Sequence, residues 1–210
     1  TGERYVDDAR KSATSVKQHS PDLPVAIVST AEIIEEQELG LFDHVIRAAV
    51  VNDDVSDKLY NLQLTPFDYT LYLDNDTLIL KPIDKIFGLL KKYDIAIMPG
   101  ENIVDIEGIP PAFKEPNGGV IAYKKNSRVD TFMKNWIRAY EQQIDNVGWV
   151  TEDSIYAKLQ KASSFGILHD QPSLRKSLWD TQIGYVPLPE EFNFKGGISA
   201  IHSDVHIIHF

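Results

Sequence analysis

Short apolar runs alternate with amphipathic segments along the first half of the chain. Residues 3–18 carry apolar side chains at helical spacing, and residues 24–29 form a short apolar run after a Pro-containing turn. Thr30 is suited to be the N-cap of the acidic helical segment AEIIEEQEL. The same pattern then predicts a strand near 45–50, a helix over 54–64 that ends at Thr65-Pro66, and a strand over 70–73.

The second half contains longer elements around one extended loop. A short helix after Pro82 and a buried strand over 94–99 lead into residues 101–117, which are rich in Pro, Gly and Glu and predict a long surface loop. The later part of the chain predicts a strand over 118–124, a helix over 152–161, a helix with Pro172 in its first turn, and the strands IGYVPL and VHIIHF.

The most regular helical pattern follows the strand over 118–124. Its apolar residues fall on one face and are Val129, Phe132, Met133, Trp136, Ile137 and Tyr140. Ser127 and Asp130 have the spacing of a capping box at its start. A helix with this apolar face is expected to cover the core.

Alternation of strands and helices indicates an α/β fold, with helices on both sides of a mostly parallel central sheet. The length of 210 residues fits a single domain with a substantial core. In such sheets ligands bind beyond the C-terminal ends of strands. The strand over 70–73 is followed directly by polar residues, so a site is expected there.

Composition narrows the classes of partner. A net charge of −10 argues against binding to nucleic acid or to an anionic membrane, which needs clustered Lys and Arg. The absence of cysteine excludes disulfides and thiolate metal sites. No apolar run is long enough to span a membrane, and a cytoplasmic location is expected. Since the chain starts at Thr1 without Met, both ends are expected to be trimmed from a longer domain.

The segment YTLYLDNDTLIL places two acidic residues at the end of an apolar, β-prone run. On a continuous strand Asp74 and Asp76 would point to one face, with Asn75 opposite. Their carboxylates would repel each other by about 4 kcal/mol at a separation of about 4 Å and an effective dielectric constant of about 20. A divalent cation such as Mg²⁺ or Mn²⁺ would offset that repulsion. The hypothesis is a site for a metal ion and a diphosphate.

Further motifs appear in order along nearly the whole chain, from Thr1 to Phe210, and are TGERY, SDKLYNLQLTPFDYTLYLDND, LDNDTLILKPIDKIF, EPNGGVIAY, HDQPSLR, LPEEFNF and VHIIHF. Together they resemble the glycogenin-like, GT-A-type glycosyltransferases, which use nucleotide-diphosphate sugars. The DND segment with its continuation is the most specific match. The resemblance implies a Rossmann-like GT-A fold over residues 1–210, with the first strand lying before Thr1 and a phosphate-binding segment lying after His209.

The resemblance also implies which residues contact the donor. Thr1 and Tyr5 match the residues that hold the nucleotide base, and Lys58 matches a lysine that reaches the phosphate or the sugar. The backbone of Asn75 would lie against the ribose. Asn117 would hydrogen-bond the donor sugar, although Pro116 replaces the family's phenylalanine before it.

Gly118 and its neighbouring glycine would let the backbone approach the sugar closely. Asp170 and Gln171 match the family's pair beside the anomeric carbon. His209 matches the third metal ligand beside Asp74 and Asp76. A nitrogen ligand beside two carboxylates favours Mn²⁺ over Mg²⁺.

Each of these residues also has a structural interpretation. Tyr5 fits a core aromatic on a helix face, and Lys58 fits a solvated surface charge. Asn117 fits an ordinary Asn-Gly turn, Asp170 fits a helix N-cap, and His209 fits a buried strand residue. The sequence leaves both interpretations open for each.

The function implied is metal-dependent transfer of a sugar from a nucleoside-diphosphate sugar, UDP being favoured, to a hydroxyl of a glycan, lipid or protein acceptor, with retention of configuration. A sugar nucleotidyltransferase is an alternative, although it should carry a Gly-rich basic loop near its N-terminus, for which TGERYVDDARK is a poor substitute. A haloacid-dehalogenase-type phosphatase would need DxDxT, and Thr77 comes one position too early. A catalytically inactive UDP-sugar-binding module remains an alternative.

Overall fold

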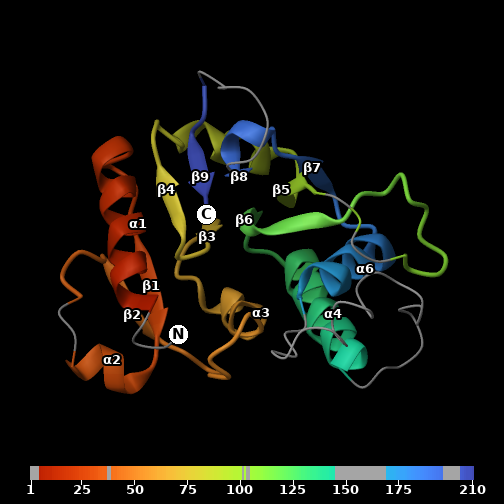
Figure 1. Cartoon of the computed structure of the whole chain (residues 1–210), viewed down its shortest axis with the longest axis horizontal. Helices are drawn as coiled ribbons and strands as arrows, with labels where there is room; N and C mark the ends of the chain where they lie inside the picture. The colour runs from red at the N-terminus through yellow and green to blue at the C-terminus, as the bar shows by residue number, and fades with distance from the viewer. Residues whose placement is uncertain (1–4, 37–38, 101, 103–104, 145–168, 196–203) are drawn as a thin grey trace.

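The computed structural model describes residues 5–36, 39–100, 102, 105–144, 169–195 and 204–210. Three sheets organise them (Figure 1). The largest has the order β3-β6-β5-β7 and consists of β3 (Tyr69–Leu73), β6 (Pro116–Lys124), β5 (Ile95–Pro99) and β7 (Tyr185–Pro187). Strand β6 is antiparallel to both neighbours, and β5 is parallel to β7.

Two smaller sheets flank the largest one. Strands β1 (Ala26–Ser29) and β2 (His44–Arg47) form a parallel pair beside α1 (Val6–His19) and α2 (Ala31–Glu36). The other sheet has the order β4-β9-β8, with β4 (Thr77–Ile79) antiparallel to β9 (Ile207–His209), and β9 parallel to β8 (Phe194–Lys195). The second small sheet therefore joins the residues that follow the DND segment to the end of the chain.

The remaining helices complete the packing. They are α3 (Asp57–Asn61) with the 3₁₀ turn η2 (Leu62–Leu64), η3 (Asp84–Lys91), α4 (Ser127–Ile144), α6 (Gln171–Thr181) and η4 (Glu190–Phe192). Helices α4 and α6 lie together on the side of the molecule opposite α1 (Figure 1). Within the described residues, no helix combines the length and the apolar character that crossing a bilayer requires.

Strand β6 lies at the centre of the core because both of its faces are covered. Ile121 and Tyr123 pack into the cluster formed with α4 and α6, which includes the fully buried Trp136. Val120 and Ala122 face the other cluster, formed with η3 and β4. Burial on both faces explains why the segment reads as a continuous apolar run.

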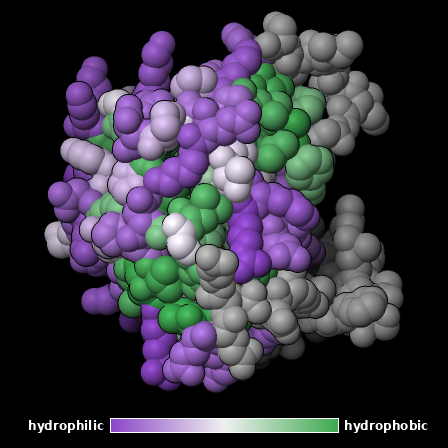
Figure 2. All heavy atoms as spheres, turned by 90° about the vertical axis from the view of Figure 1, so that its left-hand side faces the viewer, coloured by the Kyte–Doolittle hydropathy of each residue, from purple (hydrophilic) through white to green (hydrophobic). Residues whose placement is uncertain are grey.

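Helix α1 buries its apolar side chains and exposes its charged ones, as its periodicity predicts. Val6, Ala13 and Val16 are buried, whereas Asp8 and Lys11 pair with each other at 2.8 Å on the outside. The face of the molecule on this side is mostly hydrophilic, with apolar side chains in patches between the polar ones (Figure 2).

The α/β class is confirmed, and most of the expected elements are present within a few residues of their expected bounds. Thr30 caps α2 through its hydroxyl, which accepts a hydrogen bond from the backbone N–H of Ile33. Pro172 lies in the first turn of α6. The helix expected over 152–161 lies outside the described residues.

Three expectations were wrong in detail. The main sheet is mixed rather than mostly parallel, because β6 runs antiparallel between β3 and β5. Helix α4 is capped by Asn126, whose side-chain oxygen accepts from the N–H groups of Arg128 and Val129, and not by a capping box at Ser127. The short strands β4 and β8 were not expected, because strands of this length carry little periodic signal.

Asp94 ties the start of β5 to the end of β6 and the start of α4. Its carboxylate is 1% exposed and contacts Lys124 at 3.2 Å, Asn126 at 3.0 Å and Arg128 at 3.0 Å. Burial acts to raise the pKa of Asp94, but the hydrogen bonds from Asn126 and Lys124 and the nearby positive charges outweigh it, so the pKa is lowered. This carboxylate therefore stabilises the fold while it is ionised.

We expect Asp94→Ala to lower the free energy of unfolding by about 1–3 kcal/mol at pH 7, because three donors lose their shared acceptor. A depressed pKa gives stability that is present above the unfolded-state value of about 3.9 and is lost as the pH falls through the folded-state value. The difference between wild type and variant should therefore shrink in urea unfolding at pH 3.

Asp180→Ala is the matched control, because Asp180 is exposed and forms an ion pair along α6 with Lys176 at 2.7 Å. Its effect should stay within about 0.5 kcal/mol at both pH values. An Asp94→Ala deficit that is as large at pH 3 as at pH 7 would contradict an electrostatic role for Asp94.

Candidate active site at the end of β3

A turn places the two acidic residues of the DND segment. Strand β3 ends at Leu73, and the carbonyl of Asp74 accepts hydrogen bonds from the backbone N–H of Thr77 at 3.2 Å and from its hydroxyl at 2.7 Å. The two side chains therefore converge through a turn. The sequence had suggested strand alternation instead. Asp74 is in turn held by β6, because its N–H donates to the carbonyl of Gly119 at 2.8 Å.

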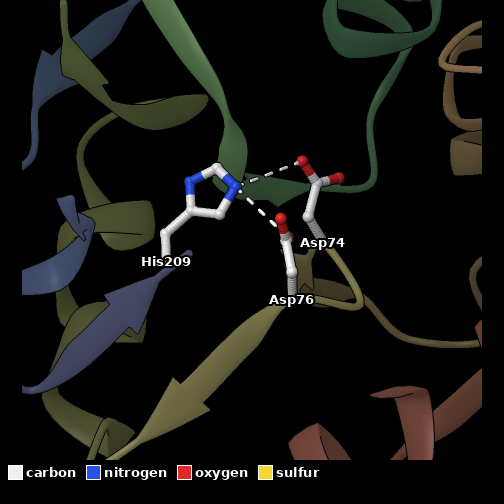
Figure 3. A group of neighbouring side chains, drawn as sticks. All are labelled: Asp74, Asp76 and His209. Carbon is white, nitrogen blue, oxygen red and sulfur yellow. Dashed lines mark ion pairs between the residues drawn. The ribbon is translucent and has the colours of Figure 1, made fainter. Parts of the chain in front are cut away.

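Pairing of β4 with β9 brings the end of the chain to this turn. Thr77 is opposite His209, and the N–H of Phe210 donates to the carbonyl of Asp76 at 3.0 Å. The Nε2 atom of His209 lies 3.3 Å from Asp76 Oδ1 and 3.6 Å from Asp74 Oδ2. All three side chains point toward one another (Figure 3).

The three residues that the resemblance assigns to a metal ion are therefore neighbours. Their ligand atoms lie within 4.8 Å of one another, which leaves room for one cation between them. Two carboxylate oxygens and one imidazole nitrogen form a donor set suited to Mn²⁺. Burial is the largest effect on the pKa of His209 and lowers it, and the positive charge of Lys195 lowers it further. The negative charges of Asp76 and Asp74 raise the pKa, but not enough to offset these effects, so the pKa is lowered. The imidazole is therefore neutral near pH 7 and able to act as a ligand.

Lys58 lies between two carboxylates and is not a surface charge. Its ammonium group is 3.2 Å from Asp170 Oδ2, 3.6 Å from Asp74 Oδ2 and 3.4 Å from the carbonyl of Gly118. Burial acts to lower the pKa of Lys58, but Asp170 and then Asp74 outweigh it and raise the pKa. This lysine is charged throughout the neutral range and links the DND turn to α6.

Asp170 occupies the N-cap position of α6, yet its side chain makes no capping hydrogen bond. The carboxylate is turned toward Lys58 instead, and Asp170 is only 4% exposed. The neighbouring Gln171 donates from its side chain to Glu115 Oε1 at 3.3 Å. The structure therefore favours a role for Asp170 in the site over the purely capping interpretation.

Two glycines of β6 allow these side chains to meet. A Cβ atom on Gly119 would lie 2.0 Å from Cε1 of His209, and one on Gly118 would lie 2.9 Å from Oδ2 of Asp170. The first distance is impossible without moving the imidazole ring. Both positions therefore require glycine because of close approach. The sequence singled out the Gly-Gly pair, but for approach to a sugar and not to His209.

Tyr72 belongs to the site although the sequence did not single it out. Its hydroxyl donates a hydrogen bond of 2.5 Å to Asp74 Oδ1. Burial, together with the charge of Asp74, raises the pKa of Tyr72 well above its usual value, so the phenol remains a donor. The sequence offered one clue to this contact. Tyr72 lies two residues before Asp74, and side chains two residues apart in extended backbone point to the same side.

A cavity of about 840 Å³ opens beside the carboxylates, between β1 and β3. Its lining is largely apolar and comes mainly from α1, β1, α3 and β3. Among the residues that line the cavity are Tyr5, Lys58, Tyr72, Asp74, Asn75 and Asp76. Thr1 lies outside the described residues. Asn117 uses its side-chain oxygen inside the protein, where it accepts from the N–H of Gly119 at 3.0 Å.

Comparison with solved structures identifies the fold. The glycosyltransferase GlyE of Streptococcus pneumoniae TIGR4 is similar with a TM-score of 0.65 at 16% identity, over 99% of this chain and 52% of GlyE. Its apo form gives a TM-score of 0.61 at 14% identity over 99% and 51%. LgtC, a galactosyltransferase solved with donor and acceptor sugar analogues, gives a TM-score of 0.52 at 14% identity over 99% and 84%.

These likenesses establish the GT-A-type glycosyltransferase fold for residues that include the whole candidate site. The chain spans about half the length of GlyE. No family model matches the sequence, and no curated protein matches it. A specific likeness to the glycogenin branch is not found among these structures.

We expect Gly119→Ala to displace the imidazole of His209, because the added methyl group would occupy the position of the ring. Overpacking of this kind costs about 1–3 kcal/mol of stability. The measurements are thermal unfolding and the NMR shifts of the His209 ring. Gly88→Ala is the control, since a Cβ on Gly88 meets nothing within 4 Å. A Gly119→Ala protein with unchanged His209 signals would show that the ring does not lie against β6.

Proposed function

We propose that this protein transfers a sugar from a nucleoside-diphosphate sugar, UDP-sugar in the first instance, to an acceptor hydroxyl. The observation that carries this proposal is the meeting of Asp74, Asp76 and His209 beyond the end of β3, with Lys58 and Asp170 beside them, in a GT-A-type fold. GlyE and LgtC, which share this fold, are named as glycosyltransferases.

Charge explains why a diphosphate donor would need a cation here. Asp74, Asp76 and Asp170 surround the site, and Lys58 supplies the ammonium group that contacts two of them. A dianionic diphosphate placed among these groups would be repelled. A Mn²⁺ ion held by Asp74, Asp76 and His209 would supply Lewis-acid stabilisation of the leaving nucleotide, worth several kcal/mol.

Each remaining residue then has a distinct task. Lys58 is fixed between β3 and α6 and would place a second positive charge beside the phosphates. Tyr72 holds one oxygen of Asp74, which leaves the other directed at His209. Tyr5 lines the cavity at a position suited to a base.

Asp170 and Gln171 would orient the sugar near its reacting carbon. Asp170 is buried and its carboxylate is directed into the site by Lys58, and Gln171 is held from behind by Glu115. Retention of the anomeric configuration is part of the proposal and rests on the resemblance of HDQPSLR to the family motif. The acceptor can be a glycan, a lipid or a protein.

Mn²⁺ binding tests the metal site by itself. By isothermal titration calorimetry, we expect Asp76→Asn and His209→Ala each to weaken Mn²⁺ binding by about tenfold or more, which is at least about 1.4 kcal/mol. Asp22→Asn, which neutralises an exposed carboxylate elsewhere, should leave the affinity unchanged. Wild-type affinity in His209→Ala would remove this residue from the coordination shell.

Turnover of a panel of UDP- and GDP-sugars with Mn²⁺ tests the chemistry. We expect hydrolysis or transfer to stop on addition of EDTA, and Asp170→Asn to lower kcat on the order of 100-fold while Mn²⁺ affinity changes little. Asp180→Asn on the exposed side of α6 is the control. Tight UDP binding without turnover of any donor would instead identify a binding module.

A further inference from the structure

One fully buried polar side chain beside the candidate site has no role in the chemistry described so far. Asn193 is 0% exposed and lies between η4 and β8, in the segment LPEEFNF. A buried carboxamide must find partners for its amino group and its oxygen. Its Nδ2 is 3.0 Å from Oδ1 of Asn117, and its Oδ1 is 3.0 Å from Nδ1 of His209.

We propose that Asn193 is the positioning residue of His209, and that it fixes the ring in the tautomer with hydrogen on Nδ1 and an open Nε2 directed at Asp74 and Asp76. The tautomer and the ring orientation follow from the hydrogen-bond geometry alone. The consequence for metal affinity rests on the proposed function.

The direction of each hydrogen bond is set by a backbone group. The N–H of Gly119 can only donate, and it donates to the Oδ1 of Asn117 at 3.0 Å. That oxygen is therefore the acceptor, so Asn193 must face it with its amino group. The oxygen of Asn193 is then left for His209, and a carboxamide oxygen can only accept. The hydrogen between Asn193 and His209 must be on Nδ1.

The carboxylates alone would favour the opposite tautomer. With hydrogen on Nε2, His209 could donate to Asp76, whose Oδ1 is 3.3 Å away. The side chain of Asp76 is 50% exposed, however, so water can satisfy it. Asn193 has no such alternative, and a reversed tautomer would leave its buried oxygen facing an unprotonated nitrogen. Leaving a buried polar group unpaired is the costlier choice.

The tautomer determines what His209 can do. A neutral imidazole with hydrogen on Nδ1 presents the Nε2 lone pair toward two carboxylate oxygens, which is the arrangement that a cation requires. Groups that hold the second nitrogen of a metal-ligating histidine typically contribute 10–100-fold to metal affinity. Asn193 also joins the ring to β6 through Asn117, so the orientation of His209 is fixed by the central strand.

The test uses two substitutions that separate hydrogen bonding from packing. Asn193→Leu fills the space but supplies no acceptor. Asn193→Asp keeps an acceptor for Nδ1–H, although it loses the donor to Oδ1 of Asn117 and places a charge in a buried position. If Asn193 only fills space, leucine should be the better replacement. If it positions His209, aspartate should be better. We expect Mn²⁺ affinity to fall about 10–100-fold in Asn193→Leu and to be largely retained in Asn193→Asp.

The second readout does not depend on metal. Long-range ¹H–¹⁵N correlation spectra of the metal-free protein report which ring nitrogen carries hydrogen, and the signals of His209 among the six histidines are assigned by their loss in His209→Gln. We expect protonated Nδ1 and unprotonated Nε2 in wild type and a shift toward protonated Nε2 in Asn193→Leu. Asn126→Ala, which removes the cap of α4, should leave the His209 signals unchanged.

Protonated Nε2 in the wild-type protein would overturn this inference even if neither variant folds. Unchanged tautomer and unchanged Mn²⁺ affinity in Asn193→Leu would do the same while leaving the proposed function intact. If the wild-type protein binds no Mn²⁺, the proposed function fails. The NMR spectra of the metal-free protein then still show whether Asn193 positions the ring.

Discussion

Close approach to strand β6 is the constraint on which the site depends. Gly119 leaves no space between the backbone and the imidazole of His209, and Gly118 packs against Lys58 and Asp170. The same stretch of backbone accepts a hydrogen bond from Asp74. Because β6 is buried on both faces and paired on both edges, it cannot shift to accommodate a larger residue. This covered and doubly paired strand therefore fixes groups that come from four other segments.

Charge balance explains the chemistry that this geometry supports. Three carboxylates face one buried ammonium group and one imidazole that burial keeps neutral. Lys58 compensates Asp170 and part of Asp74, whereas Asp76, on the exposed side, has no comparable partner among the described residues. The excess negative charge is located where a cation and the phosphates of a donor would meet. The side chains of the proposed metal site are held in place by Tyr72, Asn193 and β6.

Much of this could be predicted from the chain itself. The α/β class and most strands and helices follow from periodicity. The pair Asp74 and Asp76 follows from the DND segment, and the other residues that meet beyond β3 follow from the resemblance to GT-A-type glycosyltransferases. The sequence predicts site roles for Asp74, Asp76, Lys58, Asp170 and His209, and the structure brings these residues together. The sequence left Asp170 open between capping and function, and in the structure its side chain makes no capping hydrogen bond and lies against Lys58. What failed was local geometry, since the DND segment is a turn and the sheet is mixed.

The sequence by itself determined which side chains are available to the site and their order along the chain, because both are properties of the chain. Only the tertiary structure decided how they are held. The tautomer of His209 depends on Asn193 and on the N–H of Gly119, groups that are distant in sequence and become neighbours only when β9 pairs with β4 and β8. Hydrogen-bond direction in a buried network is set by three-dimensional neighbours, and no linear spacing encodes it.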